Sequence, residues 1–384
     1  MTKQEAREFM VKYHMINTKN NLKGIDGIVH VFNRIQSIQY DPLNVVGTNS
    51  ELVLQSRIDD FKKEMLESAL YQDRLLIDGW DKQMCIFQSK DYPQMTSIRK
   101  YRGDQEISSL KKFLKVDIMP YTGQVMEIIK DQGPIFSKDI NIGDSIEHYW
   151  GNTKISKITL DYLFHIGKIG IHHKKNTMKA YDLIERLIHH HDQENDFDDE
   201  QSFSEYYLYR RIKSMGLVSN KNGVHFSSSH INQKKARTTY LKRLLEKNLI
   251  TEIEIEGLKD KYYIVNDHIN ESSQILNQIS FIAPLDNIIW DRAILSDLFD
   301  FDYTWEVYTP KSKHKYGYYV LPMLYGTKFI GRIEFEKQRN DEPLIVKHIW
   351  LENEFEADQE YQVALEKALS KFAQYLGAKT YILS

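Results

Sequence analysis

The sequence contains little cysteine and little proline, with a single cysteine, Cys85, and eight prolines in 384 residues. One cysteine excludes an internal disulfide and a zinc site built from several thiolates, so we expect a reducing compartment. No apolar run approaches the roughly 18–20 residues that span a bilayer, and the amino terminus is charged where a signal peptide is apolar. These absences predict a cytoplasmic protein that does not enter a membrane.

Motifs for bound cofactors are absent as well. The sequence has no G-x-x-x-x-G-K-[ST] run to hold the phosphates of a nucleotide, and no H-E-x-x-H or paired-cysteine pattern to hold zinc. The run His189-His190-His191 favours a solvated segment over a metal site, because consecutive histidines cannot all face one ion. We therefore expect no cofactor and no metal.

Charge of one sign is not in excess, because 51 Lys and Arg face 54 Asp and Glu, a formal net charge of −3. This balance excludes a uniformly basic protein that coats DNA, but it leaves room for a local basic face. Hydrophobic residues make up 41% of the chain, which is enough for a packed core.

The order of elements from 121 to 188 is typical of a winged helix, in which short helices precede a strand, a loop and a second strand. Apolar spacing predicts a helix that ends at Gly133-Pro134 and another over 155–164 that ends at Gly167. A short helix over 136–140, capped by Ser137, is expected between them. Strands at 169–171 and 179–181 with a loop at 172–176 complete the module.

The same order recurs from 203 to 265, with helices over 206–215 and 232–247 and two strands joined at Gly257. The first 115 residues are expected to hold a third, more divergent copy. Six acidic residues between 192 and 200 predict a solvated linker. From about 280 the sequence changes to short strands followed by a helix, which predicts a small barrel or curled sheet. The predicted strands are 304–308, 316–325, 328–335 and 345–350, the helix is 354–376, and a last strand is 381–383.

These features predict an α+β protein with tandem winged-helix modules and a small β-barrel-like C-terminal domain. The predicted domains are a divergent winged helix with the active-site motif at 1–115, a second winged helix at 116–191, the acidic linker at 192–202, a third winged helix at 203–275 and the C-terminal domain with its closing helix at 276–384.

Positive charge is concentrated on the elements that meet phosphates in winged-helix proteins. Residues 151–180 hold six lysines against one aspartate, and 205–250 hold ten Lys and Arg against two glutamates. A third patch at 311–319 alternates cations with aromatics, a mixture that suits backbone contact and base stacking. Ordinary solvated surface is the alternative for each patch. The predicted DNA contacts are Lys154, Lys157, Lys174, Lys175, Lys234, Lys235, Arg237, Lys313, Lys315 and Tyr316.

The segment Gln39-Tyr40-Asp41-Pro42 is the best candidate for chemistry. Pro42 disfavours helix at Asp41, and in an extended chain Gln39 and Asp41 point to the same side. Gln36 could partner Asp41 only if a helix continued through the motif, which Pro42 opposes. On spacing alone, the alternative is a turn in which Asp41 binds local backbone.

The motif resembles the signature of the AlkZ/YcaQ-type DNA glycosylases, also described as winged helix DNA-binding domain-containing proteins. The similarity continues in collinear order over most of the chain, at 39–46, 52–57, 163–170, 181–186, 283–292 and 301–322. This resemblance implies tandem winged helices and a small barrel around duplex DNA. It also implies excision of alkylated purines of the N7-alkylguanine type and, in some members, unhooking of interstrand crosslinks.

The family's motif of Gln, an apolar or aromatic residue, then Gln or Asp maps onto Gln39, Tyr40 and Asp41, in the Asp form of the YcaQ-like branch. The resemblance implies Asp41 and Gln39 as catalytic residues in a base excision repair enzyme. We place Tyr40, Asn49, Trp290 and Arg292 near the substrate. Residues 77–82 depart from the His-Glu-bearing stretch of many members, so no lesion contact is carried over there.

The remaining expectations are a monomer located at the nucleoid, with alkylated double-stranded DNA as its partner. Trp290, Asp291 and Arg292 have a structural alternative, an aromatic anchor with a local ion pair. The alternative for the whole chain is a winged-helix transcription regulator without chemistry, in which Asp41 only caps a turn.

Overall fold

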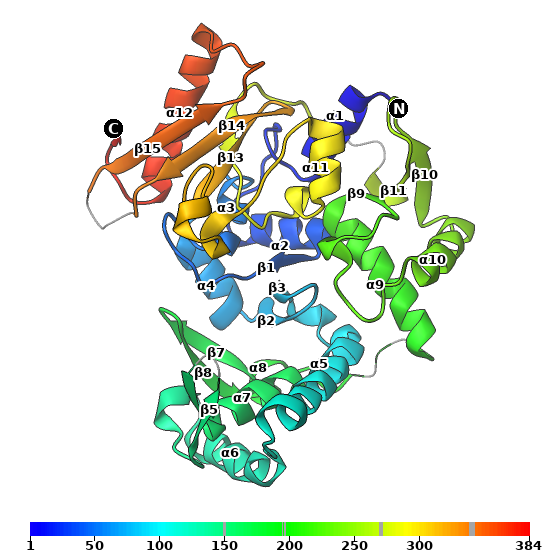
Figure 1. Ribbon diagram of the computed structural model, residues 1–384, viewed down its shortest axis with the longest axis vertical. Coiled ribbons are helices and arrows are strands. Elements are labelled where there is room, and N and C mark those ends of the chain that lie inside the picture. The colour runs from blue at the N-terminus through cyan, green and yellow to red at the C-terminus, as the bar shows by residue number, and fades with distance from the viewer. Residues whose placement is uncertain (149–150, 194, 196, 269–271, 338–341) are drawn as a thin grey trace. The chain divides into compact units, whose positions relative to one another are not determined.

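The computed structural model describes residues 1–148, 151–193, 195, 197–268, 272–337 and 342–384 (Figure 1). The chain forms two compact units, of which unit 1 comprises residues 1–66 and 201–384 and unit 2 comprises residues 67–200. Helices and strands occur in both units, which confirms the α+β class. Among the described residues, none of the helices has the length and apolar character needed to cross a bilayer.

Capping boxes start two of the helices in unit 1. At α1 and at α3 a threonine accepts from the backbone of a glutamate three residues later, and that glutamate binds back, which satisfies N–H groups left over at the helix end. The helices are α1 (Lys3–Tyr13), α2 (Gly24–Ile35), α3 (Asn49–Gln55), α9 (Glu200–Met215), α10 (Lys234–Glu246), α11 (Arg292–Phe299) and α12 (Gln359–Tyr375), while α4 (Lys63–Tyr71) crosses the boundary between the units.

The C-terminal part of unit 1 is an open, bulged sheet of five strands in the order β12-β13-β14-β15-β16. Its neighbours are antiparallel except β15 and β16, and bulges interrupt the β13–β14 and β14–β15 pairings. Helix α12 packs beside this sheet (Figure 1). Rings of Phe281, Phe335 and Phe372 lie 5.0–5.4 Å apart and join α12 to the sheet. The strands are β12 (Ile279–Phe281), β13 (Val320–Tyr325), β14 (Lys328–Phe335), β15 (Leu344–Leu351) and β16 (Tyr381–Leu383).

Residues 203–265 form the helices and the strand pair that the sequence predicts there. The strand order is β10-β11-β9, and Gly257 turns the chain between β10 and β11 with a φ of +79°. Phe203, Tyr207 and Tyr262 are buried in this part. The strands are β9 (Leu217–Ser219), β10 (Ile250–Glu254) and β11 (Lys261–Val265).

Unit 2 contains a buried apolar cluster that includes Ile129, Leu160 and Tyr181. Strands β4, β8 and β7 form one sheet, β2 and β3 pair as a hairpin that the sequence did not predict, and β5 pairs with β6. Its elements are β2 (Leu76–Trp80), β3 (Met84–Gln88), α5 (Thr96–Ser109), α6 (Met119–Gln132), β4 (Ile135–Phe136), β5 (Ser145–His148), β6 (Gly151–Lys154), α7 (Ile155–His165), β7 (Ile169–Lys175), β8 (Met178–Leu183) and α8 (Ile184–Leu187).

Three local predictions are wrong. The helix expected over 136–140 is a short strand and a 3₁₀ turn, because Ile135 and Phe136 pair with β8 instead. The loop expected at 172–176 is mostly strand, since β7 continues to Lys175 and the chain turns only at Asn176 and Thr177. The strand expected over 304–308 ends in the 3₁₀ turn η8 (Glu306–Tyr308).

The predicted division into four domains and an acidic linker stays a prediction. The first predicted domain, 1–115, is divided between the two units after Leu66, and unit 2 ends at Glu200, inside the predicted acidic linker. Two acidic residues of that linker, Glu194 and Asp196, lie outside the described residues.

Two glycines at helix ends allow a matched test of packing around α1. Gly216 and Gly377 both have a φ of +76°, but an added Cβ would lie 2.6 Å from the Tyr13 ring at Gly216 and would meet nothing within 4 Å at Gly377. We expect Gly377→Ala to lower the free energy of unfolding by about 1 kcal/mol through its backbone conformation alone. Gly216→Ala should cost roughly 1–3 kcal/mol more, because Tyr13 must move. Urea denaturation measures the two free energies of unfolding, and equal losses for Gly216→Ala and Gly377→Ala would contradict this prediction.

Candidate active site

The Gln39–Asp41 motif lies where the backbone of unit 1 leaves the core. Helix α2 ends at Ile35, and Gln36 has a positive φ of 64°, so Gln36 and Asp41 do not share a helix, as Pro42 predicted. Strand β1 (Ser37–Gln39) follows, with its first two residues buried. Gln39, Tyr40 and Asp41 are each half-buried, so the motif is not sealed in the interior.

The Asp41 carboxylate is held through both of its oxygens. Oδ1 accepts a hydrogen bond of 2.9 Å from the backbone N–H of Leu43, which is the local turn considered from the sequence. Oδ2 accepts from the hydroxyl of Tyr308 at 3.3 Å. A carboxylate has about four acceptor positions, so these two bonds leave capacity on each oxygen.

Asn49 fixes the backbone of the motif to a distant loop. Its Nδ2 donates to the carbonyl of Gln39 at 2.7 Å, and its Oδ1 accepts from the N–H of Leu285 at 3.0 Å. Only 2% of Asn49 is exposed. The structure therefore places this residue, predicted to lie near the substrate, behind the motif as a bridge.

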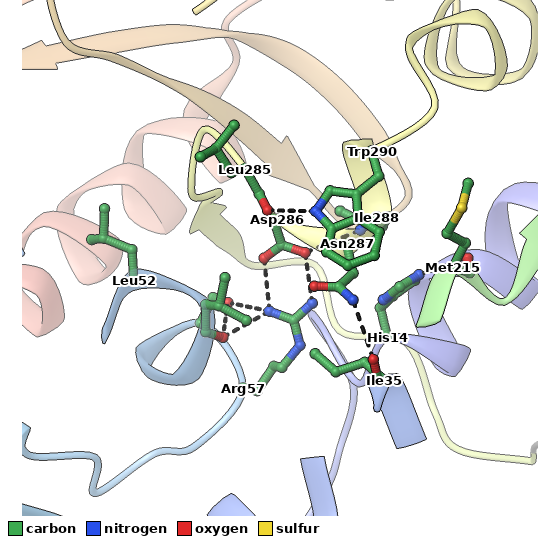
Figure 2. A network of polar contacts seen from close by, with 12 residues as sticks. His14, Ile35, Leu52, Arg57, Met215, Leu285, Asp286, Asn287, Ile288 and Trp290 are labelled. Atoms are coloured by element: carbon green, nitrogen blue, oxygen red, sulfur yellow. Dashed lines mark hydrogen bonds and ion pairs between the residues drawn. The ribbon is translucent and has the colours of Figure 1, made fainter. Parts of the chain in front are cut away.

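A buried ion pair organises the same region, as Figure 2 shows. The guanidinium of Arg57 and the carboxylate of Asp286 form two hydrogen bonds of 2.8 Å, and both side chains are 0% exposed. Arg57 also donates to the carbonyl of Val53 at 2.7 Å, and Asp286 accepts from the N–H of Ile288 at 3.1 Å. The pair fixes the end of α3 against residues 285–288.

Asn287 extends this network to the strand that carries the motif. Its Nδ2 lies 3.3 Å from the carbonyl of Ile35 (Figure 2). It is also 3.0 Å from the carbonyls of Ser37 and Ser214. The indole of Trp290 donates to the carbonyl of Leu285 at 2.8 Å. Trp290, predicted to lie near the substrate, is therefore a buried anchor of the loop.

His14 lies in the same buried network, with Nε2 3.0 Å from the carbonyl of Met215. Burial, together with the charge of Arg57, lowers the pKa of His14 to about 3. The imidazole is therefore neutral at physiological pH, and its contact with a carbonyl identifies Nε2 as the protonated nitrogen.

The turn η8 places Tyr308 next to Asp41, and the loop after η8 carries aromatic and cationic side chains. The buried carboxylate of Glu306 accepts from the backbone N–H groups of Lys315, Tyr316 and Gly317 at 2.7–3.1 Å. Burial alone would raise the pKa of Glu306, but these three donors lower it. The loop that carries Lys313 and Lys315 is thereby closed on itself, and both lysines are exposed.

The predicted DNA contacts in α10 differ in exposure. Lys234 and Lys235 are exposed, whereas Arg237 is 0% exposed. The guanidinium of Arg237 donates to the carbonyls of Ile231 and Asn232 at 2.9 Å. The structure therefore gives Arg237 a role in folding the loop before α10.

Unit 2 shows the same division among its lysines. Lys154, Lys157 and Lys175 are exposed. Lys174 pairs with the buried carboxylate of Asp78 at 2.5 Å, and burial lowers its pKa although Asp78 opposes the shift. Its ammonium is thus engaged inside unit 2.

Two other predicted residues lie within unit 1 as packing elements. Arg292 donates to the carbonyl of Pro284 at 2.9 Å and lies 4.7 Å from the centre of the Tyr303 ring. Tyr316 is half-buried between Arg332 and Trp350. The Asp291 carboxylate caps α11 and lies 3.4 Å from Nε2 of His225. Among the described His, Cys, Asp and Glu residues, no group of three is arranged to hold a metal ion.

Sequence reasoning identified Gln39 and Asp41 but missed the roles of Arg57, Asp286 and Tyr308. All three belong to segments that resemble the glycosylase family, yet nothing in their spacing shows that they converge on the motif. Tyr308 and Asp41 are 267 positions apart.

Comparisons with known proteins identify a family and a similar fold. A profile of the family described as "DNA glycosylase AlkZ-like" matches residues 32–375, which is most of the chain. Among solved structures, the DNA glycosylase AlkZ of Streptomyces sahachiroi has a similar fold, with a TM-score of 0.65 and 12% sequence identity over 100% of both chains.

We expect the buried ion pair to be costly to break from one side. Asp286→Leu leaves the Arg57 charge unpaired in the interior and should lower the free energy of unfolding by about 3–5 kcal/mol. The double variant Arg57→Met/Asp286→Leu should be more stable than Asp286→Leu alone, because no charge remains buried. Urea denaturation of the two variants checks this, and a double variant less stable than the single one would contradict it.

Proposed function

Because the chain belongs to the AlkZ-like DNA glycosylase family, we propose that it is a monofunctional glycosylase for alkylated purines of the N7-alkylguanine type in duplex DNA. DNA glycosylase activity follows from the family, while the substrate, the mechanism and the residues are the proposal. The observation that supports it most is an Asp41 carboxylate held at both oxygens yet half-buried.

The proposed chemistry needs only the groups of the motif. An N7-alkylated guanine carries a positive charge and leaves without a general acid, so the enzyme must stabilise cationic character at the sugar and supply water. Asp41 would act electrostatically and as a general base, which typically contributes about 10²–10⁴-fold. Gln39 would orient the water. Residues 39–46 contain no lysine, in keeping with a hydrolytic mechanism.

A cationic base also needs less enclosure than a neutral one. It can be expelled without deep burial, so full extrusion into a pocket is not required. The half-buried position of Asp41 suits this, and the proposal extends to interstrand crosslinks made through the same purine nitrogen.

Exposed lysines of each unit would contact the phosphates. In unit 1 these are Lys234, Lys235, Lys313 and Lys315, and in unit 2 they are Lys154, Lys157 and Lys175. The alternative, a regulator that binds DNA without chemistry, has no need of a carboxylate fixed by a distant tyrosine. Membership of a glycosylase family favours the enzyme.

Asp41→Asn should abolish release of free base from duplex DNA that contains N7-methylguanine. The substitution removes the negative charge while keeping size, so we expect the single-turnover rate to fall at least about 10²-fold. Free base and abasic sites are measured together. Asp59→Asn, at an exposed carboxylate outside the motif, is the matched control and should act like the wild type. Undiminished release by Asp41→Asn would show that the assigned carboxylate is wrong.

Replacing both Lys234 and Lys235 with Gln should weaken DNA binding and flatten its dependence on salt. Each lost phosphate contact reduces the slope of log K against log salt by about 0.9. Arg237 is left in place because it is buried. Lys367→Gln in α12, an exposed lysine outside the predicted patches, should leave the slope unchanged. An unaltered slope in the Lys234/Lys235 variant would mean that α10 does not touch phosphates.

A further inference from the structure

Tyr308 combines high exposure with a specific polar contact. Its side chain is among the most exposed large side chains described, at 81%, yet its hydroxyl lies 3.3 Å from Oδ2 of Asp41. A carboxylate can only accept, so the tyrosine hydroxyl is the donor. An exposed tyrosine ordinarily directs its hydroxyl to water, and this one is directed to the motif.

The backbone around Tyr308 is fixed by contacts on both sides. Glu306, two residues earlier, accepts the three N–H groups of the following loop. The ring of His314 lies 2.8 Å from the carbonyl of Thr309. The Tyr308 ring packs edge-on against Trp305 with centroids 5.7 Å apart, and Trp305 packs in the same way on Tyr319. The position of the hydroxyl is therefore built into the fold.

The two sides of Asp41 are held by different parts of unit 1. Oδ1 is bound by its own loop through Leu43, and Oδ2 is bound by the loop that carries Tyr308. Together the two donors restrict rotation of the carboxylate.

We propose that Tyr308 is a positioning residue that orients the Asp41 carboxylate for attack on the sugar–base bond, an inference that rests on the proposed function. Tyr308 would not touch the reacting atoms. It would keep the carboxylate in one rotamer, with its remaining acceptor positions available for the attacking water. The same bond would act in the free enzyme, before DNA binds.

The charged neighbours of the pair are few. Partial desolvation and the charge of Asp41 raise the pKa of Tyr308, and Tyr318 adds a smaller effect in the same direction. Burial raises the pKa of Tyr319, with Asp41 among the further causes, so Tyr319 stays neutral at physiological pH. Removal of the Tyr308 hydroxyl therefore changes one donor and no net charge.

The test is Tyr308→Phe, which keeps the ring and removes the donor. We expect the single-turnover rate of N7-methylguanine release to fall roughly tenfold, as for loss of one hydrogen bond to a charged group. Affinity for undamaged duplex and the unfolding midpoint should stay unchanged. Tyr381→Phe, which removes a tyrosine hydroxyl in β16, outside the predicted patches, should match the wild type.

A second readout does not depend on activity. The ¹³Cζ resonance of Tyr308, assigned with Tyr308→Phe, is titrated in the wild type and in Asp41→Asn. The pKa of Tyr308 should fall when the neighbouring charge is removed. An unchanged titration, or a Tyr308→Phe variant with the wild-type rate, overturns the inference. If the wild type releases no base from any alkylated duplex, the proposed function fails instead, whatever the titration shows.

Discussion

The geometry of the motif depends on one buried ion pair, that between Arg57 and Asp286. Two charges without exposure to water are tolerated only when they are paired and their remaining hydrogen-bonding capacity is used. Here the pair is bidentate, Arg57 also donates to the carbonyl of Val53, and Asp286 also accepts from the N–H of Ile288, so most of this capacity is used, although the buried Nε of Arg57 has no partner among the described residues. Because the buried charges must be paired and hydrogen-bonded, the end of α3 has to pack against residues 285–288 in one arrangement. Through Asn287 and Asn49, the same meeting point fixes the backbone at Ser37, before the motif, and at Gln39, its first residue.

Local elements could be predicted because their signals lie within a few residues. Apolar spacing and glycine breaks identified β14 and α7 near their observed bounds. The prediction of a strand over 304–308 was wrong for a nonlocal reason. The Glu306 carboxylate accepts hydrogen bonds from backbone N–H groups nine to eleven positions later, and these bonds bend the chain. In the same way Phe136 joins a sheet through a strand 44 positions away, which no local pattern indicates.

The site was predictable only in part, for the same physical reason. Spacing and family resemblance identified Gln39 and Asp41, but the partners that hold them come from residues 285–308. Charge counts have a similar limit. They predicted a basic α10, yet they could not distinguish Lys234, which is exposed, from Arg237, which is buried. The guanidinium of Arg237 donates hydrogen bonds to backbone carbonyls. Lys174 shows the same limit in unit 2, where its ammonium forms an ion pair with the buried carboxylate of Asp78.

The two interpretations of Asp41 drawn from the sequence are compatible. The turn role and the proposed catalytic role of Asp41 exclude each other only if the carboxylate is counted as a single acceptor. In the structure Oδ1 closes the turn while Oδ2 faces the Tyr308 hydroxyl. The turn then becomes part of the proposed chemistry, because a carboxylate fixed by its own backbone does not have to be reorganised when positive charge develops at the sugar. A leaving base that already carries its charge requires no enclosed acid, so a fixed anion at a half-buried position is sufficient.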